Sequence, residues 1–239
     1  MERNIDAFNK DVEGNEGYLY STNAQLSSQM ANKRLTDITS ASFDYKDKKV
    51  LDIGCGDGTY TVKLLDNKPA SILGVDPAEK AIGMARKKAE GTGIEFQVCG
   101  AYELPFEDNS FDIAHIRGVL HHLDNPSAAL KEALRVAKHV FVIEPNGFNP
   151  VLKVLEKASP YHRKHDEQSF SSWKLDKWIQ QAGGKVIRRS WVGLVPMFCP
   201  NWLAKGAKAV EPVVERIPLF SHVICAVYAF VAVKTTDKP

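Results

Sequence analysis

The sequence predicts a single α/β domain built on a mostly parallel sheet that helices cover on both faces. Three observations favour this class: strand and helix patterns alternate after residue 44, an apolar strand runs directly into a glycine-rich turn, and 239 residues suit one large domain. Such alternation is typical of parallel sheets with crossover helices. We therefore expect one domain over residues 1–239.

The elements follow in order along the chain. Apolar runs predict strands at "KVLDI", "SILGVD", "IEFQV", "FDIAHI" and "HVFVIEP", and helices are expected at 57–67, 77–90 and 126–138. The stretch "SSWKLDKWIQQAGG" predicts another helix, with serines suited to its N-cap and Gly183 and Gly184 suited to end it. The runs "KVIRRSWV" and "HVICAVYAFVAV" predict two closing strands. The apolar part of the second, 223–233, is too short to span a bilayer.

Two segments lie outside this alternation. Residues 1–44 show weak helical spacing through Leu26, Met30 and Leu35, and we expect them to pack as a cap near the strand ends. Residues 193–221 separate the last two strands by far more than a hairpin needs. They predict a lid, a pocket wall or a partner surface.

Composition narrows the class of function. The 31 basic and 29 acidic residues nearly cancel, so the broad positive charge of a nucleic-acid-binding protein is missing, and we expect no nucleic-acid partner. The N-terminus is too polar for a signal peptide, which favours a reduced, cytoplasmic location without a transmembrane segment. The cysteines form no CxxC pair, which argues against a zinc site and a disulfide framework. They are Cys55, Cys99, Cys199 and Cys225.

The stretch "KKVLDIGCGDGTYT" predicts a ligand site directly after the first strand. Its glycines let a ligand approach the backbone, at the edge of the sheet where ligands of open parallel sheets bind. The spacing Gly54-x-Gly56-x-Gly58 departs from a dinucleotide fingerprint, because Thr59 stands where a third glycine is expected. Asp52, just before the turn, favours a cationic ligand.

Asp76 ends the second predicted strand at the same edge. Its carboxylate could accept hydrogen bonds from both hydroxyls of a ribose, a feature that dinucleotide-binding proteins share. Alternatively, it caps the helix that begins near Pro77. The two roles compete for one carboxylate.

Four ordered motifs resemble those of class I S-adenosylmethionine-dependent methyltransferases, of the small-molecule type related to ubiquinone/menaquinone methyltransferases. The motifs are "VLDIGCGDGTYT", "LGVDPAEKAIGMARKKA", "CGAYELPFEDNSFDIAHIRGVLHHLDNP" and "ALRVAKHVFVIEPN". The resemblance covers residues 48–146 well and "SFSSWKLDKWIQQAGGKVIRRSW" more loosely. It implies a Rossmann-like, doubly wound sheet of seven strands, mostly parallel with an antiparallel last strand. The chain then divides into a helical N-terminal cap (1–44), a cofactor-binding half (45–146) and an acceptor-side half (147–239) with a lid insertion (193–221).

The resemblance also implies a cofactor, S-adenosylmethionine, with S-adenosylhomocysteine as product. The glycine turn would lie under its methionine part, Asp52 near its amino group, Asp76 on its ribose and Pro77 beside its adenine. Gly100 stands where the family often has an acid, so the adenine amino group would rely on backbone, water or Tyr102. The implied contacts are Asp52, Gly54, Cys55, Gly56, Asp76, Pro77, Gly100, Ala101, Tyr102, Arg117 and Gly118. An alternative for the Arg117 side chain is a salt bridge to Asp112 or Glu144.

Three residues are candidates for catalysis. Methyl transfer is an in-line attack on a sulfonium methyl, which needs a dry pocket and a positioned acceptor more than elaborate acid–base groups. A hydroxyl acceptor would want a base, for which His121 and His122 are candidates, unless both are scaffold. Neighbours on a helical turn diverge, so we expect at most one to face the cofactor. Glu144 is a further candidate, or it caps "PNGFNP".

The acceptor side is less defined. In "SPYHRKHDEQSF", Arg163 could hold a carboxylate or phosphate, flanked by His162 and His165, and Trp202 in the lid completes the tentative substrate set. The alternative is a solvated charged loop. A metal at these histidines lacks a fourth ligand, so we expect none.

The leading hypothesis is methyl transfer to a small-molecule, glycan or lipid-linked acceptor. Lid residues such as Met197, Phe198 and Leu203 favour an acceptor with apolar surface. The methylated atom (O, N or C) and the oligomeric state stay open. One alternative is a catalytically idle S-adenosylmethionine-binding partner subunit. Another is a nucleic-acid methyltransferase, which "RGVLHHL" disfavours because it stands in place of an Asn/Asp-Pro-Pro-aromatic motif.

Overall fold

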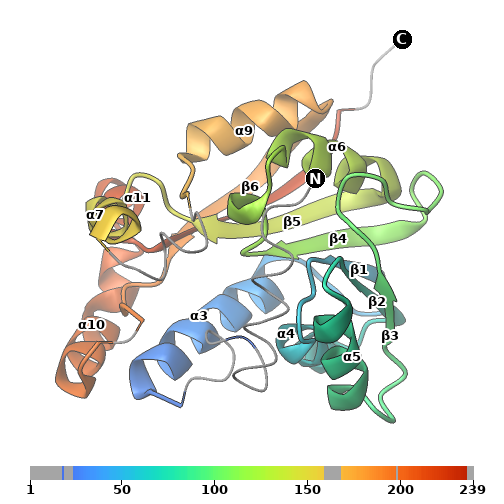
Figure 1. Ribbon diagram of the computed structural model, residues 1–239. Coiled ribbons are helices and arrows are strands. Elements are labelled where there is room, and N and C mark those ends of the chain that lie inside the picture. The colour runs from blue at the N-terminus through green and yellow to red at the C-terminus, as the bar shows by residue number, and fades with distance from the viewer. Residues whose placement is uncertain (1–17, 19–23, 159–167, 198, 236–239) are drawn as a thin grey trace.

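The computed structural model describes residues 18, 24–158, 168–197 and 199–235 (Figure 1). A seven-stranded sheet with the order β3-β2-β1-β4-β5-β7-β6 forms its centre. The strands are β1 (Lys49–Ile53), β2 (Ser71–Asp76), β3 (Glu95–Val98), β4 (Phe111–Arg117), β5 (Ala137–Pro145), β6 (Gly184–Val192) and β7 (Val227–Lys234). Within this sheet, the pairings made by β7 are antiparallel and the others are parallel. The predicted Rossmann-like class, with its antiparallel last strand, is confirmed.

Helices lie on both faces of this sheet. They are α3 (Leu26–Ser42), α4 (Thr59–Lys63), α5 (Glu79–Lys88), α6 (Pro126–Val136), α7 (Pro150–Ala158), α9 (Ser172–Gln181), α10 (Asn201–Val214) and α11 (Pro218–Ile224). Figure 1 shows α6 and α9 on one side and α3, α4 and α5 on the other. Along β5, Val140 and Val142 join the core on one face, whereas Phe141 and Ile143 join the core on the other. Burial on both faces explains why β5 reads as a continuous apolar run.

Local signals at α9 act as the sequence predicts. The Ser171 side chain accepts a hydrogen bond from the backbone N–H of Lys174, and Gly183 follows the helix with φ of +80°. The serine satisfies an otherwise unpaired N–H group, and glycine adopts the left-handed conformation without a Cβ clash.

Two predicted boundaries are wrong. The helix expected at 57–67 is α4 followed by a 3-10 turn, Leu64–Asn67, and the last strand begins at Val227 because Val223 and Ile224 belong to α11. Side-chain amides explain the second difference: Asn146 donates to the carbonyls of His222 and Cys225, and Asn149 donates to that of Ile224. Because these carbonyls already accept hydrogen bonds from side chains, they need no hydrogen bonds from a neighbouring strand.

The predicted cap and lid segments meet each other. Arg34 of α3 pairs with Glu215, which follows α10, and donates to both of its carboxylate oxygens. Between β6 and β7 the chain forms α10 and α11. Residues 1–17 and 19–23 of the predicted cap and Phe198 of the predicted lid lie outside the described residues. In the described part of the chain, no helix combines the length and the apolar character needed to cross a bilayer.

Gly58 and Gly83 give a matched test of helix packing. Gly58 precedes α4 with φ of +76°, and a Cβ there would lie 2.8 Å from the Cβ of Ala85 in α5. We expect Gly58→Ala to lower the free energy of unfolding by about 1–3 kcal/mol. Gly83 lies inside α5, and a Cβ there would meet no atom within 4 Å, so Gly83→Ala should raise that free energy by about 0.5–1 kcal/mol. Urea unfolding measures both, and equal effects would contradict this account.

Candidate active site

The glycine turn lies at the carboxyl end of β1, in close contact with two other segments. The N–H groups of Gly54 and Cys55 both donate to the carbonyl of Val75 in β2. A Cβ on Gly54 would lie 2.4 Å from Val119, and one on Gly56 would lie 2.6 Å from the ring of Tyr18. Both glycines have positive φ. The turn therefore has no room for larger side chains and presents backbone at the sheet edge.

Asp76 joins the glycine turn to the beginning of α5. Its side chain is 8% exposed, and its oxygens accept hydrogen bonds from the N–H groups of Gly56 (3.0 Å) and Ala78 (2.9 Å). The predicted N-cap role of Asp76 is wrong, because α5 begins at Glu79 with Ala78 as its N-cap, and the contact with Asp76 lies just before the helix. The ribose-binding role stays a prediction.

Asp52 has partners inside the protein. Its buried carboxylate lies 2.7 Å from Nδ1 of His115 and accepts a 2.6 Å hydrogen bond from Thr61. These contacts connect β1 to β4 and to α4. The expected position beside a ligand amino group stays a prediction.

Cys55 lies in the glycine turn near three carboxylates. Burial is the largest cause that raises the pKa of its thiol well above the ordinary value, and the carboxylates of Asp52, Asp76 and Asp57 raise it further. Asp57 is paired with Lys88, and Asp52 contacts His115. The raised pKa therefore reflects a buried thiol with acidic neighbours.

Tyr18 and Asp57 contribute to the site, and sequence reasoning assigned neither a contact. Asp57 is 3% exposed and forms a 2.7 Å ion pair with Lys88 of α5. The backbone N–H of Tyr18 donates to Asp57, and its ring packs against Ala78. No local pattern around Tyr18 signals this position, because tertiary packing alone places it over Gly56.

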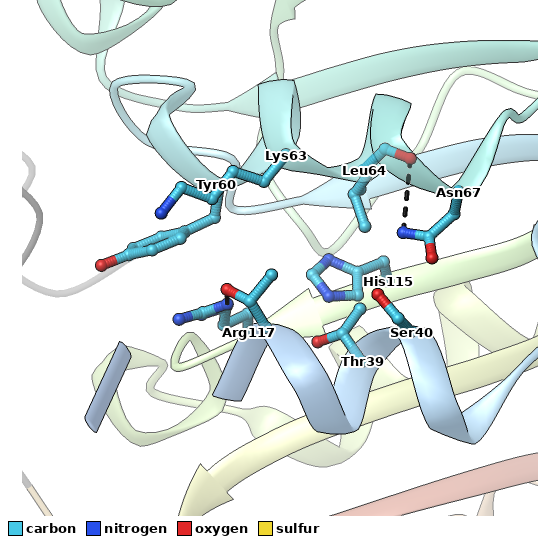
Figure 2. A pocket seen from close by; sticks show the side chains of 9 residues that line it. Thr39, Ser40, Tyr60, Lys63, Leu64, Asn67, His115 and Arg117 are labelled. Carbon is cyan, nitrogen blue, oxygen red and sulfur yellow. Dashed lines mark hydrogen bonds between the residues drawn. The ribbon is translucent and has the colours of Figure 1, made fainter. Parts of the chain in front are cut away.

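Arg117 binds neither of the acids considered for it. Its guanidinium lies 3.7 Å from the centre of the Tyr60 ring and donates to Thr36 and Asn32 of α3. Figure 2 shows Arg117 and His115 facing α3 across a small cavity of about 10 Å³. Burial lowers the pKa of Arg117 to about 10. The expected ion pairs with Asp112 or Glu144 are wrong, since the arginine turns toward α3 instead.

The remaining predicted cofactor residues lie at the same edge of the sheet. Gly118 follows β4 with positive φ, and its N–H donates to the carbonyl of Ile143. Ala101 is buried, and the hydroxyl of Tyr102 accepts a hydrogen bond from the N–H of Asn125. Pro77 directly follows β2, and Gly100 lies two residues after β3.

Glu144 organises the segment that carries the two histidines. Its fully buried carboxylate accepts from the N–H groups of Val119, Leu120 and His121, and one oxygen lies 2.7 Å from Nδ1 of His121. The expected cap on "PNGFNP" is wrong, because the Asn146 side chain accepts from the N–H of Phe148, and backbone carbonyls accept from the N–H groups of Asn146, Gly147 and Asn149. A carboxylate bound to Nδ1 selects the tautomer whose Nε2 accepts a proton.

The two histidine rings lie against each other, with centroids 3.9 Å apart. The expectation that these two neighbouring side chains point in different directions is therefore wrong. His121 is 8% exposed. Glu144 fixes the orientation of the His121 ring directly, and the His122 ring packs against that of His121.

The structure describes one of the four predicted acceptor residues, Trp202. His162, Arg163 and His165 lie outside the described residues. Trp202 is 74% exposed on α10. Among the residues that the structure describes, no three His, Cys, Asp or Glu side chains are arranged to hold a metal ion.

The sheet order, the glycine turn and the acid ending β2 define a class I fold for a nucleoside-containing cofactor. Residues 51–140 match the family described as methyltransferase domain. Over these residues the chain is similar to the class I S-adenosylmethionine-dependent methyltransferases.

Three curated relatives illustrate the match. An uncharacterized methyltransferase of Schizosaccharomyces pombe is 38% identical over 39% of this chain and 37% of its own length. A ubiquinone/menaquinone biosynthesis C-methyltransferase of Desulfotalea psychrophila is 35% identical over 38% of this chain and 37% of its own length. A tRNA U34 carboxymethyltransferase of Nautilia profundicola is 33% identical over 40% of this chain and 33% of its own length. The chain thus spans little more than a third of these relatives.

Solved structures share the whole fold. The complex of the Haloferax volcanii Trm112 methyltransferase activator with a methyltransferase contains a chain with a TM-score of 0.67 and 17% identity. The alignment covers 98% of both chains. At this identity the likeness describes the fold alone.

The raised pKa of Cys55 predicts slow alkylation. At pH 8 we expect iodoacetamide to modify Cys55 at least about tenfold more slowly than an unperturbed thiol, because little thiolate is present. Asp76→Asn removes one of the charges that raise this pKa, so it should accelerate the reaction and shift its pH profile downward. Peptide mass spectrometry measures the rate, with Lys87→Gln as a control for general surface charge. An unchanged profile in Asp76→Asn would contradict the electrostatic account.

Proposed function

We propose that this protein transfers a methyl group from S-adenosylmethionine to a small-molecule, glycan or lipid-linked acceptor. The observation that carries the proposal is the glycine turn, whose backbone lies beside the buried carboxylates of Asp52 and Asp76 near the carboxyl ends of β1 and β2. S-adenosylmethionine has a sulfonium, an ammonium and no phosphate, so it suits a turn with acidic neighbours. The match of residues 51–140 to methyltransferase domains supports the same cofactor.

In this proposal the cofactor lies across the carboxyl ends of β1, β2 and β4. Gly54, Cys55 and Gly56 would contact its methionine part together with Gly118. Asp76, at the end of β2, would accept the ribose hydroxyls. Pro77, Gly100, Ala101 and Tyr102 would surround the adenine, and the hydrogen bond from Asn125 supports the Tyr102 hydroxyl in place.

His121 is the favoured base for a hydroxyl acceptor. The cofactor supplies an activated methyl on a cationic leaving group, so the chain must orient the acceptor and accept its proton. Glu144 holds Nδ1 of His121, which leaves Nε2 as the proton acceptor. Glu144 is then a positioning residue, and His122 packs on the base. An acceptor that attacks through a carbanion or a neutral amine needs no such base.

Two alternative functions are a nucleic-acid methyltransferase and a catalytically idle partner subunit. A tRNA-modifying relative matches about a third of its length, but the near-balanced charge of this chain lacks the footprint of a nucleic-acid-binding protein. An idle partner subunit would bind the cofactor and show no turnover with any acceptor. The orientation of His121 by a buried carboxylate favours an enzyme over the idle subunit.

Calorimetric titration tests the cofactor directly. We expect micromolar binding of S-adenosylmethionine and S-adenosylhomocysteine, and no binding of NAD. Asp76→Ala should weaken binding by about tenfold to a hundredfold, since it removes a charged acceptor for two hydroxyls. Asp66→Ala, an acid in the turn after α4, is the matched control. A folded protein that binds neither sulfur nucleoside would refute the proposal.

Substitution of His121 tests the base. With a hydroxyl acceptor, His121→Ala should lower kcat by about 100-fold to 10,000-fold while leaving cofactor affinity within about twofold, because a general base acts in the chemical step. His122→Ala should lower kcat by less than about tenfold. The pH profile should lose its lower limb only in His121→Ala. Equal losses of kcat in both variants would contradict the assignment of His121 as the base.

A further inference from the structure

The outer surfaces of α10 and α11 are apolar. On α10 the exposed apolar side chains include Trp202, and on α11 they include Leu219, which is 76% exposed. We call the whole set the outer apolar face: Trp202, Leu203, Val210, Val213, Leu219, Phe220, Val223 and Ile224. Eight exposed large apolar side chains on two consecutive helices are unusual on a protein surface and indicate a binding partner.

Helical spacing places each half of this face on one side of its helix. At about 100° per residue, the four α10 members fall within about 100° of the helix circumference, and the four α11 members within about 140°. On α10 the opposite side is buried through Ala204 and Glu211, and Ser221 of α11 is also buried. Both helices therefore turn apolar stripes away from the domain, the reverse of an ordinary surface helix.

Tertiary contacts hold the two helices beside the active-site edge. Asn149 donates to the carbonyl of Ile224 at 2.7 Å, and the rings of Phe148 and His222 lie 4.9 Å apart. Asn146, the residue after β5, donates to the carbonyl of His222. Figure 1 shows α7, α10 and α11 together on the side of the molecule toward which β5 points. The outer apolar face thus adjoins the strand end that carries Glu144.

The charges around this face favour an anionic partner. Lys205 and Arg216 are exposed beside it. The two acids of the segment turn inward: Glu211 accepts from the N–H of Leu194, and Glu215 accepts from the N–H of Gly193. Glu211 is also paired with Lys208, and Glu215 with Arg34. Exposed positive charge beside Trp, Phe and Leu is typical of helices that lie in a membrane interface.

We propose that the outer apolar face docks the protein on an anionic lipid bilayer, with α10 and α11 lying in the plane of its surface. Helices of 14 and 7 residues are too short to span the hydrocarbon region, which fits a surface position. The docking is independent of the proposed function. Where that function holds, docking brings the carboxyl end of β5 to an acceptor that resides in the membrane.

Vesicle co-sedimentation tests the docking. We expect the protein to sediment with vesicles of phosphatidylcholine mixed with phosphatidylglycerol, to sediment poorly with phosphatidylcholine alone, and to be released by salt. Trp202→Ala combined with Leu219→Ala should weaken binding by about tenfold or more. Lys205→Glu combined with Arg216→Glu should weaken binding to anionic vesicles by a similar factor. Ile187→Ala, an exposed apolar site on β6, and Lys87→Glu on α5 are the matched controls.

Each outcome decides the proposal. Loss of binding in the face variants alone, with unchanged circular dichroism, supports it. No sedimentation with anionic vesicles overturns it, as does an equal loss in the controls. A stable dimer in analytical ultracentrifugation that Leu219→Ala dissociates would assign the face to a second copy of this chain instead. Titration with S-adenosylhomocysteine on the same variants keeps the two proposals separate, because docking can fail while cofactor binding persists.

Discussion

The site depends on how tightly the chain closes around the glycine turn. Val119 from the loop after β4 and Tyr18 from the N-terminal segment approach the turn so closely that no Cβ fits at Gly54 or Gly56. Asp76 then joins the turn to α5 through the N–H of Gly56. This packing fixes the carboxyl ends of β1, β2 and β4 relative to one another. The proposed ligand-binding edge is therefore already formed in the free protein. Preorganisation of this kind lowers the conformational cost of binding.

Charge acts locally in this molecule rather than through the net balance. The chain as a whole is almost neutral, yet three carboxylates, Asp52, Asp57 and Asp76, lie around Cys55. On α10 and just after it, Glu211 and Glu215 turn inward and leave lysine and arginine outside. The overall count of charges conceals both arrangements.

The sequence predicts the parts of the fold that local pattern determines. The alternation of strands and helices, Ser171 as N-cap and Gly183 as helix stop all depend on neighbours in the chain. What it could not predict depends on distant partners. Arg117 contacts α3 across 81 residues of sequence, and Val223 and Ile224 become helical because Asn146 and Asn149 satisfy the carbonyls at that helix end. Likewise, Glu144 was recognisable as an acid at a strand end, but its partners in residues 119–121 were not.

Helix α3 is in contact with both of the regions that matter for function. Its Arg34 pairs with Glu215 at the end of α10, and its Asn32 and Thr36 receive the guanidinium of Arg117 at the end of β4. A single helix therefore contacts both the segment after α10 and the end of β4, the strand that precedes Gly118. The hydrogen bonds of Arg34 and of Arg117 each join α3 to one of these segments, so a displacement of α10 relative to the end of β4 would have to strain or break one of the two sets.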